Sequence, residues 1–370
     1  MKMFILNLAL IFSTVLIVSG HGVLQVLLLG GNGFIGSHLT LALLSHQSRL
    51  MNITMVSRGN WPFDTDKTIE PYVFHIPCDR YDVNGLRGCP EFMNIIKHIA
   101  FDCVVDFSAY EPNVLREALL VLKQKAGIYI YISSDSIYEV SEPSNSTKSR
   151  EEDGIRPHDP ELYTKLAEAD SYGDEKFQGE DVLTSQEFVP YIIFRLPDVM
   201  GERDGTKRWW FYTSWLQHYQ AIGEPLPIPS HLENVKTSYV YAPDVGTLIA
   251  DIILGRFTSD INNQIFNLAF EDGVTLKELL LEMSSNLETE IEFQVKDNAV
   301  FMLPSVTRGP VDISKAKKYL NFKPTDWRMA LRKTIYFYKK ANMKFPKERD
   351  QVVDKLIRLA VPDDKKEKSM

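Results

Sequence analysis

The sequence predicts an α/β fold, in which a doubly wound parallel sheet is followed by a smaller C-terminal region. From Val23 onward, short apolar runs alternate with helical stretches, which is the pattern of consecutive β-α-β units. The runs VLQVLLL and YIIF are apolar at every or nearly every position, as expected for strands that helices cover on both faces. With 370 residues and 44% hydrophobic content, the chain is long enough for two domains with a sizeable core.

Six strands are expected in the first part of the chain, with helices between them. The expected strands are Val23–Leu29, Ile53–Ser57, Tyr72–Ile76, Cys103–Phe107, Ile128–Ser133 and Tyr191–Arg195. Helical patterns include Phe34–Ser45 and Val114–Lys125. The polar segment from Pro143 to Pro160 indicates a long loop. After Gly201 the strand-helix alternation ends, so a different kind of structure is expected there.

The composition excludes several classes of protein. A net charge of −8 argues against nucleic-acid binding through a broad basic face. The three cysteines, Cys78, Cys89 and Cys103, are too few and too irregularly spaced for a disulfide framework or a CxxC zinc site. None of the eight histidines stands in an HExxH pattern, and no metal site is expected.

Residues 1–20 have the layout of a secretory signal peptide or signal anchor. One lysine precedes an apolar run from Met3 to Val18, and small residues follow before His21. The run is short for a membrane span of about 20 residues. The prediction is entry into the secretory pathway, as a secreted or lumenal protein with Asn145 as a candidate glycosylation site. Membrane contact is expected only if the segment is retained. The alternative is a buried extra strand or helix in a cytoplasmic protein, and cysteines without partners would suit a reducing compartment equally well.

A glycine-rich turn joins the first expected strand to the first expected helix. Gly30, Gly33 and Gly36 follow the spacing GxxGxxG, and Phe34 and Ile35 open the helix. Such a turn lets the backbone approach a pyrophosphate at a helix N-terminus, as in the Rossmann-type dinucleotide fold. Because the turn lies between an apolar strand and a helix, the sequence favours a dinucleotide site over a plain turn.

The end of the second expected strand bears on the choice of dinucleotide. An acidic residue there would bind the ribose 2′-hydroxyl of NAD, whereas an arginine suits the 2′-phosphate of NADP. Ser57 stands at the strand end and Arg58 follows it. The sequence therefore favours NADP over NAD. The alternative is that Arg58 is a solvated loop charge.

A tyrosine and a lysine four residues apart can form an acid/base pair, because a helix places them on one face. A nearby cation is expected to lower the pKa of the phenol from about 10. Three pairs have this spacing: Tyr172/Lys176, Tyr319/Lys323 and Tyr336/Lys340. The spacing alone therefore decides little. The first pair is the candidate because it follows the strand that ends in Ser133 and Ser134, where hydroxyls would face a ligand crevice.

The order of these motifs resembles the extended branch of the short-chain dehydrogenase/reductase superfamily, the NAD(P)-dependent epimerases and dehydratases. The resemblance covers roughly residues 23–338. The matching motifs are GGNGFIG (30–36), CD (78–79), VVDFSAY (104–110), ISSDSIY (132–138), YxxxK (172–176), FRLPDVMGERD (194–204), SYVYAPDVG (238–246) and VDISKAKKYLNFKP (311–324).

The resemblance implies roles for individual residues. It makes Tyr172 the acid/base, and Lys176 its electrostatic partner, which also holds the nicotinamide ribose. It makes Ser134 the hydroxyl that polarises the substrate oxygen, with Ser133 as the fallback. It further implies that Asp79 binds the adenine amino group. Phe107, Ser108 and Ala109 would form the wall beneath the cofactor, and the protein would be a homodimer.

Two departures from the family pattern concern the substrate. Asp198 occupies a stretch where nucleotide-sugar enzymes usually carry asparagine, and Arg308 matches their diphosphate-binding arginine only loosely. We keep both as weak candidates for substrate binding. The aromatic stretch Trp209–Tyr212 resembles a reductase-like subgroup in which some members bind RNA. Ordinary packing is the favoured interpretation of that stretch.

These observations give a domain plan and two functional hypotheses. Residues 21–200 would form the NAD(P)-binding domain and 201–345 mostly the substrate-binding region, with segments returning to the first domain. Residues 346–370 would form a C-terminal helix and a charged tail. The main hypothesis is an NAD(P)-dependent epimerase, dehydratase or reductase that acts on a sugar-type substrate, with a nucleotide sugar as one candidate. The alternative is an NAD(P)-binding scaffold or RNA-associated protein with little turnover.

Overall fold

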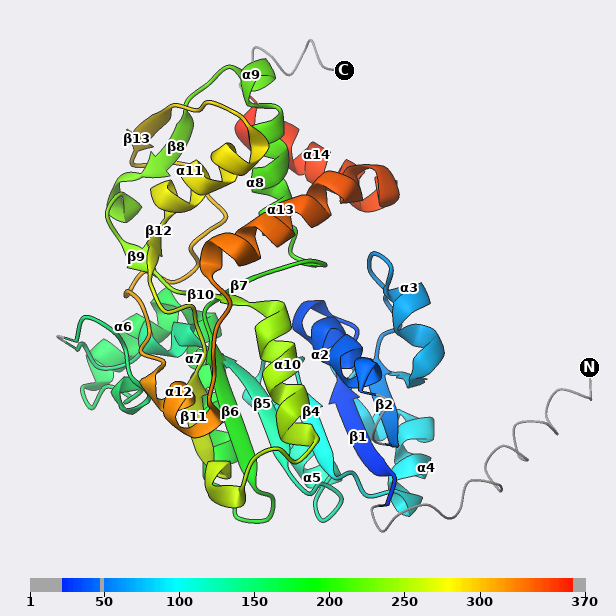
Figure 1. The fold of residues 1–370 in the computed structure, drawn as a ribbon. Coiled ribbons are helices and arrows are strands. Elements are labelled where there is room, and N and C mark those ends of the chain that lie inside the picture. Colours follow the sequence, from blue (N-terminus) through cyan, green and yellow to red (C-terminus); the bar gives the residue numbers. More distant parts are fainter. Residues whose placement is uncertain (1–21, 47–49, 145, 362–370) are drawn as a thin grey trace, which may run out of the picture.

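The computed structural model describes residues 22–46, 50–144 and 146–361. At its centre is a parallel sheet with the strand order β11-β6-β5-β4-β1-β2-β3 (Figure 1). The strands are β1 (Leu24–Leu29), β2 (Met51–Ser57), β3 (Phe74–Pro77), β4 (Cys103–Asp106), β5 (Tyr129–Ser134), β6 (Tyr191–Leu196) and β11 (Gln264–Asn267). The predicted α/β fold with a doubly wound parallel sheet is confirmed.

The six expected strands are all present, with small shifts at their ends. The third begins at Phe74 because Tyr72 belongs to a 3-10 turn, Glu70–Tyr72, that precedes it. A seventh strand, β11, was not expected. It comes from the second half of the chain and pairs with β6 at the edge of the sheet. Residues from the second half of the chain therefore contribute a strand to the central sheet.

Helices cover both faces of the sheet (Figure 1). One face carries α2 (Phe34–Ser45), α10 (Ala242–Ile253) and α12 (Ser314–Leu320), and the other carries α4 (Pro90–His98), α5 (Pro112–Val121) and α7 (Ser171–Thr184). Strand β1 packs against helices on both faces of the sheet. Val26 and Leu28 belong to the core on one face, and Leu27 and Leu29 belong to the core on the other. This explains why the strand is almost uniformly apolar.

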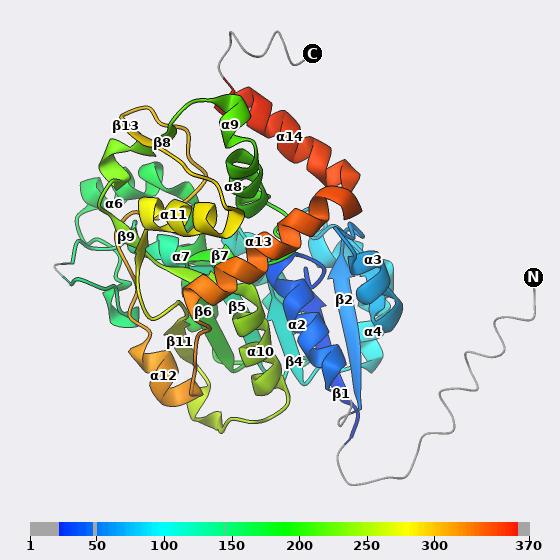
Figure 2. The same cartoon turned by 45° about the horizontal axis from the view of Figure 1, so that its top comes forward.

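The C-terminal region has a core of its own, packed mainly by helices (Figure 2). These are α8 (Arg208–Gln217), α9 (Tyr219–Ile222), α11 (Leu276–Leu287), α13 (Trp327–Lys344) and α14 (Pro346–Ala360). Three small strand pairs complete it: β7 (Asp198–Met200) with β10 (Tyr239–Tyr241), β8 (Leu226–Pro229) with β13 (Phe293–Lys296), and β9 (Lys236–Thr237) with β12 (Val274–Thr275). Trp209, Trp210, Phe211 and Tyr212 of α8 are all buried there, so the packing interpretation of this stretch is confirmed.

Two further helices stand beside the central sheet. They are α3 (Thr65–Thr68), which follows β2, and α6 (Pro160–Ala169), which directly precedes α7 (Figure 1). The long loop expected from Pro143 ends where α6 begins. The strand order reverses direction between β1 and β4, and a ligand crevice is expected at the carboxyl ends of the strands at such a point.

The expected signal segment, residues 1–20, lies outside the described residues, as do Asn145 and the charged tail from residue 362. Within the described ranges, no helix is both long enough and apolar enough to cross a membrane.

Candidate active site

A cleft of about 1320 Å³ opens at the carboxyl ends of the central strands. Its walls come from the glycine-rich turn, the ends of β2 to β6, the start of α7 and loops of the C-terminal region. The sequence-predicted residues that line it are Gly30, Gly33, Phe34, Ile35, Gly36, Arg58, Asp79, Phe107, Ser108, Ser133, Ser134, Tyr172, Lys176 and Asp198. The structure thus brings together residues from distant parts of the sequence.

The glycine-rich turn has the backbone shape that its glycines permit. Gly30 has a φ of +81°, and a Cβ there would lie 2.9 Å from the Cβ of Ser108. A Cβ on Gly36 would lie 2.6 Å from the Cα of Gly31, so α2 can pack this closely on the turn only with glycine at 36. Both positions therefore require glycine for a physical reason.

The N-terminus of α2 points its first N–H groups toward this cleft without a capping side chain. Gly33 is the N-cap residue and offers no side-chain acceptor, and the first turn contains no acidic residue. The backbone N–H groups at the start of a helix lack intrahelical partners and attract anions. The turn and the helix start therefore fit a dinucleotide pyrophosphate, which supplies the acceptors that the protein does not.

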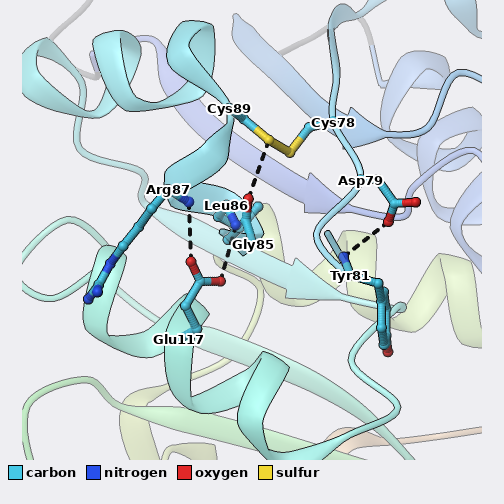
Figure 3. The surroundings of a disulfide bond; sticks show 8 residues. All are labelled: Cys78, Asp79, Tyr81, Gly85, Leu86, Arg87, Cys89 and Glu117. Atoms are coloured by element: carbon cyan, nitrogen blue, oxygen red, sulfur yellow. Dashed lines mark hydrogen bonds between the residues drawn. A yellow bond between two sulfur atoms is a disulfide. The ribbon is translucent and has the colours of Figure 1, made fainter. Parts of the chain in front are cut away.

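The loop after β3 forms the wall of the same end of the cleft, and a disulfide fixes its base (Figure 3). Cys78 and Cys89 are bonded, with their Cα atoms 5.8 Å apart, while Cys103 is free and buried in β4. The expectation that Cys78 and Cys89 have no partners is therefore wrong, because the turn between β3 and α4 brings them together. Asp79 lies inside the closed loop and accepts a hydrogen bond from the backbone N–H of Tyr81 at 3.0 Å.

A buried carboxylate that the sequence analysis did not single out orders the cofactor wall. Asp106, at the end of β4, accepts hydrogen bonds from the N–H groups of Ser108 and Ala109, each at 3.0 Å. It also pairs with Arg80 at 2.6 Å, and both side chains are buried. Burial alone would raise the pKa of Asp106, but the Arg80 charge and these donors hold it below its usual value. A lone charged residue that ends an apolar strand was the available sequence signal.

Phe107 and Ser108 line the cleft, whereas Ala109 is buried behind it. The carbonyl oxygen of Ala109 accepts a hydrogen bond from Lys176 at 2.9 Å. Arg58 is exposed at the edge of the cleft, next to Ser57, whose hydroxyl is hydrogen-bonded to His75 at 2.9 Å. No acidic side chain occupies this strand end.

Ser134, Tyr172 and Lys176 meet where β5 and α7 lie side by side. Ser134 and Tyr172 both line the cleft, and the Ser134 hydroxyl donates a hydrogen bond to the hydroxyl of Ser136 at 3.2 Å. The Lys176 ammonium lies 5.9 Å from the centre of the Tyr172 ring. It donates to the carbonyl oxygens of Ala109 and Ile132, each at 2.9 Å. Tyr172 is 41% exposed, in the cleft, while Lys176 is 2% exposed.

The electrostatics of this group differ from the expectation. Burial lowers the pKa of Lys176 to about 8. The pKa of Tyr172 is raised, first by desolvation of its hydroxyl and then by neighbouring Tyr110, while the Ser134 side chain acts in the opposite direction. The net shift of the phenol pKa is therefore upward, opposite to the expected lowering.

The hydroxyl of Ser133, the alternative to Ser134, is already hydrogen-bonded to another side chain. It donates to Glu180 of α7 at 2.5 Å, and Glu180 pairs with Arg195 of β6 at 2.7 Å. All three side chains are buried. This network, which the sequence analysis missed, ties α7 to the two strands beside it and so fixes the position of Tyr172.

Asp198 and Arg308, the two weak candidates for substrate binding, lie in different places. Asp198 lines the cleft, but its carboxylate pairs with Arg208 and accepts from the N–H and hydroxyl of Ser305 at 2.6 and 2.7 Å. Arg308 is not among the cleft-lining residues. Its guanidinium donates to the carbonyl oxygens of Tyr138, Ser141 and Glu142. The proposed match of Arg308 to a diphosphate-binding arginine is therefore not supported by its position.

Two comparisons with known proteins place these features in context. UDP-arabinose 4-epimerase 1 of Arabidopsis thaliana is 29% identical over 219 residues, which cover 54% of this chain and 49% of that protein. The putative UDP-arabinose 4-epimerase 2 of the same plant is 27% identical over 202 residues, or 50% of this chain and 45% of that protein. The matched part of the chain thus spans about half the length of these curated relatives.

Solved structures with the same fold cover more of the chain at lower identity. A UDP-glucuronic acid 4-epimerase from Bacillus cereus, in complex with NAD, has a TM-score of 0.64 at 17% identity and covers 87% of this chain and 98% of its own. A UDP-glucose 4-epimerase from Thermotoga maritima, with UDP-glucose, has a TM-score of 0.64 at 20% identity, over 86% of this chain and all of its own. At these identities the likeness establishes the fold.

The model of one protein family matches residues 26–269, which is more than half of the chain and includes the glycine-rich turn and the Ser134–Tyr172–Lys176 group. The chain belongs to the NAD-dependent epimerase/dehydratase family.

Proposed function

We propose that this protein is an NAD(P)-dependent enzyme that oxidises or reduces a sugar-type hydroxyl or carbonyl, as an epimerase, a dehydratase or a reductase. The observation that carries the proposal is the placement of Ser134, Tyr172 and Lys176 together in the cleft, with buried Lys176 one helical turn from Tyr172. The curated relatives are named as UDP-arabinose 4-epimerases, and these names support a sugar-type substrate.

Each residue of this group has a task that follows from its position. The Tyr172 phenol takes the proton from a substrate hydroxyl, or returns it to a carbonyl oxygen, since it is the acid/base group exposed in the cleft. Ser134, which lines the cleft with Tyr172, would donate a hydrogen bond to the substrate oxygen and so align it with the phenol. Lys176 braces β5 against the wall after β4 through its two carbonyl contacts, and adds positive charge beneath the phenol.

The dinucleotide would be held by the glycine-rich turn and the start of α2 at its pyrophosphate, by Asp79 at its adenine, and by Phe107 and Ser108 along its length. When bound, it supplies the hydride acceptor or donor of the reaction. We propose that NADP is preferred to NAD, because Arg58 stands beside the end of β2 and no acidic residue does.

A binding and turnover experiment tests this function. The purified full chain is titrated with NAD and NADP by calorimetry. Turnover on a panel of sugars and nucleotide sugars is followed by absorbance for net oxidation or reduction, and by NMR of the products for epimerisation or dehydration, which regenerate the dinucleotide. The proposal expects dinucleotide binding and turnover that the Tyr172→Phe variant loses. Tight dinucleotide binding with no turnover on any compound of the panel would instead favour the scaffold alternative.

We also propose entry into the secretory pathway, with a mature chain that begins near His21. Support comes from the layout of residues 1–20 and from the Cys78–Cys89 disulfide, because such bonds persist in oxidising compartments. Mass spectrometry of the full chain expressed in a eukaryotic cell tests this. A processed N-terminus or a glycan at Asn145 supports it, and an intact Met1 on an unglycosylated cytosolic protein contradicts it.

A further inference from the structure

Helix α13 has two faces of opposite character. Leu331, Ile335 and Tyr338 are among the residues that are buried against the core of the C-terminal region. The opposite face is exposed, and in Figure 2 the helix lies at the front of the molecule with no other element drawn over it. A helix face that its own chain leaves uncovered is open to a partner, and its composition indicates which partner it suits.

The exposed face is strongly basic. The helix contains six basic residues and no acidic one, in a chain whose net charge is −8. All six basic residues are exposed: Arg328, Arg332, Lys333, Lys339, Lys340 and Lys344. We call this surface the basic face of α13. It concentrates positive charge in a protein that is acidic as a whole.

Ion pairs compensate little of this charge. Arg328 pairs with Glu282 of α11 at 3.3 Å. Among the described residues, no carboxylate forms an ion pair with the other five basic residues of the helix. Those five side chains are therefore available to an anionic partner.

Two carboxylates lie at the margins of the basic face. Asp244 is subject to the charge of Lys333, and Asp64 to that of Lys344. Neither carboxylate is within ion-pair distance of that lysine, and Asp64 is already paired with Arg203 at 2.7 Å. The positive charge of the face is reduced at its margins but not cancelled.

A row of large apolar side chains runs along the middle of the basic face. Met329, Tyr336 and Met343 are 51%, 60% and 83% exposed. Their seven-residue spacing places them in one row, because two turns of an α-helix take about 7.2 residues. No other helix in the described ranges presents more than one exposed large apolar side chain.

The basic residues lie on both sides of this row. At about 100° per residue, Arg328, Arg332 and Lys339 lie on one side, and Lys333, Lys340 and Lys344 lie on the other. Tyr336 and Lys340 are one of the three tyrosine–lysine pairs in the sequence. Here the ammonium group lies 4.1 Å from the centre of the ring, on the surface rather than in a cleft.

Apolar side chains between two rows of cations suit the surface of an anionic lipid bilayer. Lysine and arginine bind anionic headgroups, while apolar and aromatic side chains enter the boundary between headgroups and acyl chains. A nucleic acid would use the cations and could stack on Tyr336, but it would leave Met329 and Met343 in water. A second copy docked through the same face would place cations against cations.

We propose that the basic face of α13 docks the protein reversibly onto a bilayer that contains anionic phospholipids. The cations supply attraction to the headgroups, and the row of Met329, Tyr336 and Met343 supplies apolar contact. The inference goes beyond the proposed catalytic function and does not depend on it.

The test measures co-sedimentation of the full chain with lipid vesicles. Vesicles of phosphatidylcholine alone are compared with vesicles of equal parts phosphatidylcholine and phosphatidylserine. We expect binding to the anionic vesicles only. Binding should weaken as the salt concentration rises, because salt screens exposed charges.

A matched pair of triple variants assigns the charge contribution to α13. Lys339→Gln, Lys340→Gln and Lys344→Gln together should weaken binding to the anionic vesicles about a hundredfold, because each lysine near the surface contributes about fivefold. The control combines Lys97→Gln, Lys165→Gln and Lys296→Gln. These make the same change of net charge at exposed positions on α4, α6 and β13, and should leave binding nearly unchanged.

A second pair of variants tests the apolar row. Met343→Gln removes the most exposed of the three apolar side chains and should weaken vesicle binding about fivefold. Leu120→Gln makes a similar change on α5, where the side chain is 51% exposed, and should have no effect. Thermal unfolding of each variant shows whether the fold is retained.

Three results would overturn the inference. The first is no binding of the wild type to the anionic vesicles. The second is equal binding by the two triple variants, which would place the contact elsewhere in the chain. The third is an RNA oligouridine that binds more tightly than the vesicles and depends on the same lysines but not on Met343, which would make the face a nucleic-acid site.

Discussion

The two ends of the cleft are built by different means. The dinucleotide end depends on backbone geometry: the positive φ of Gly30, the close packing of Gly36 on Gly31 and the uncapped start of α2. The opposite end depends on side chains, among them Asp198, which pairs with Arg208. A backbone site has few sequence solutions and is easily recognised, whereas side chains in a cleft can change without disturbing the fold. The dinucleotide end is therefore the part of the cleft that can be recognised from the sequence.

The largest effect is expected at the buried pair that orders the dinucleotide end. Asp106→Asn leaves Arg80 buried without its counter-charge and should lower the free energy of unfolding by about 3–5 kcal/mol. Because the folded-state pKa of Asp106 is lowered, its contribution is present above the unfolded-state pKa, about 3.8, and is lost as the pH falls through the folded value. Urea unfolding at several pH values should show the difference from wild type shrinking below about pH 4. Equal stability at neutral pH would contradict this.

Removal of the disulfide tests whether the dinucleotide end depends on a covalent clamp. The bond closes a loop with a sequence separation of 11, and the chain-entropy model gives about 3 kcal/mol for a loop of this size. Cys78→Ser with Cys89→Ser should lower the free energy of unfolding by about that amount. NAD binding should weaken as well, because Asp79 lies within the loop. An unchanged unfolding midpoint in the double variant would refute the prediction.

The junction of the two ends is tested by Tyr172→Phe. The ring keeps its place beside Tyr110 while the titrating hydroxyl is lost, so turnover on an identified substrate should fall at least about a hundredfold. The dissociation constant of the dinucleotide should change little. Full turnover in the variant would show that Tyr172 is not the acid/base group.

Gly36→Ala tests the backbone construction directly. The added Cβ would lie 2.6 Å from the Cα of Gly31, a backbone atom that cannot move alone. We expect a loss of about 1–3 kcal/mol in stability and weaker dinucleotide binding. Gly205→Ala is the matched control, because nothing lies within 4 Å of a Cβ there. If both variants behave alike in thermal unfolding and calorimetry, close packing at Gly36 is not what the site requires.

The smallest effect concerns Arg58. Arg58→Ala should weaken NADP binding by about tenfold, the lower range for a charge-assisted contact, because the side chain is exposed. NAD binding should change much less, since NAD lacks the 2′-phosphate. Calorimetric titration of both dinucleotides measures the difference. Equal losses would remove the argument for NADP.

Local features of this chain could be predicted from its sequence, and long-range pairings could not. The helix Phe34–Ser45 is found with the predicted bounds, because a strand, a glycine turn and an apolar periodicity all lie within one short stretch. The Cys78–Cys89 bond and the Glu180–Arg195 pair depend on how separate elements meet. Strand β11 was missed because the chain returns to the sheet as α10 and β11 only after α8 and α9 of the C-terminal region, so no continuous strand-helix alternation leads to it.

The chain passes several times between the parallel sheet and the C-terminal region, and this path bears on how such proteins diverge. After β7 the chain builds α8 and α9, returns to the sheet as α10 and β11, leaves again for α11, comes back as α12 and ends in α13 and α14. Because its elements alternate along the chain with those of the sheet, the C-terminal region cannot be exchanged as one continuous segment. Removing such a segment would also remove elements of the sheet. New specificity must then arise by replacement of individual side chains or by growth of loops around the cleft.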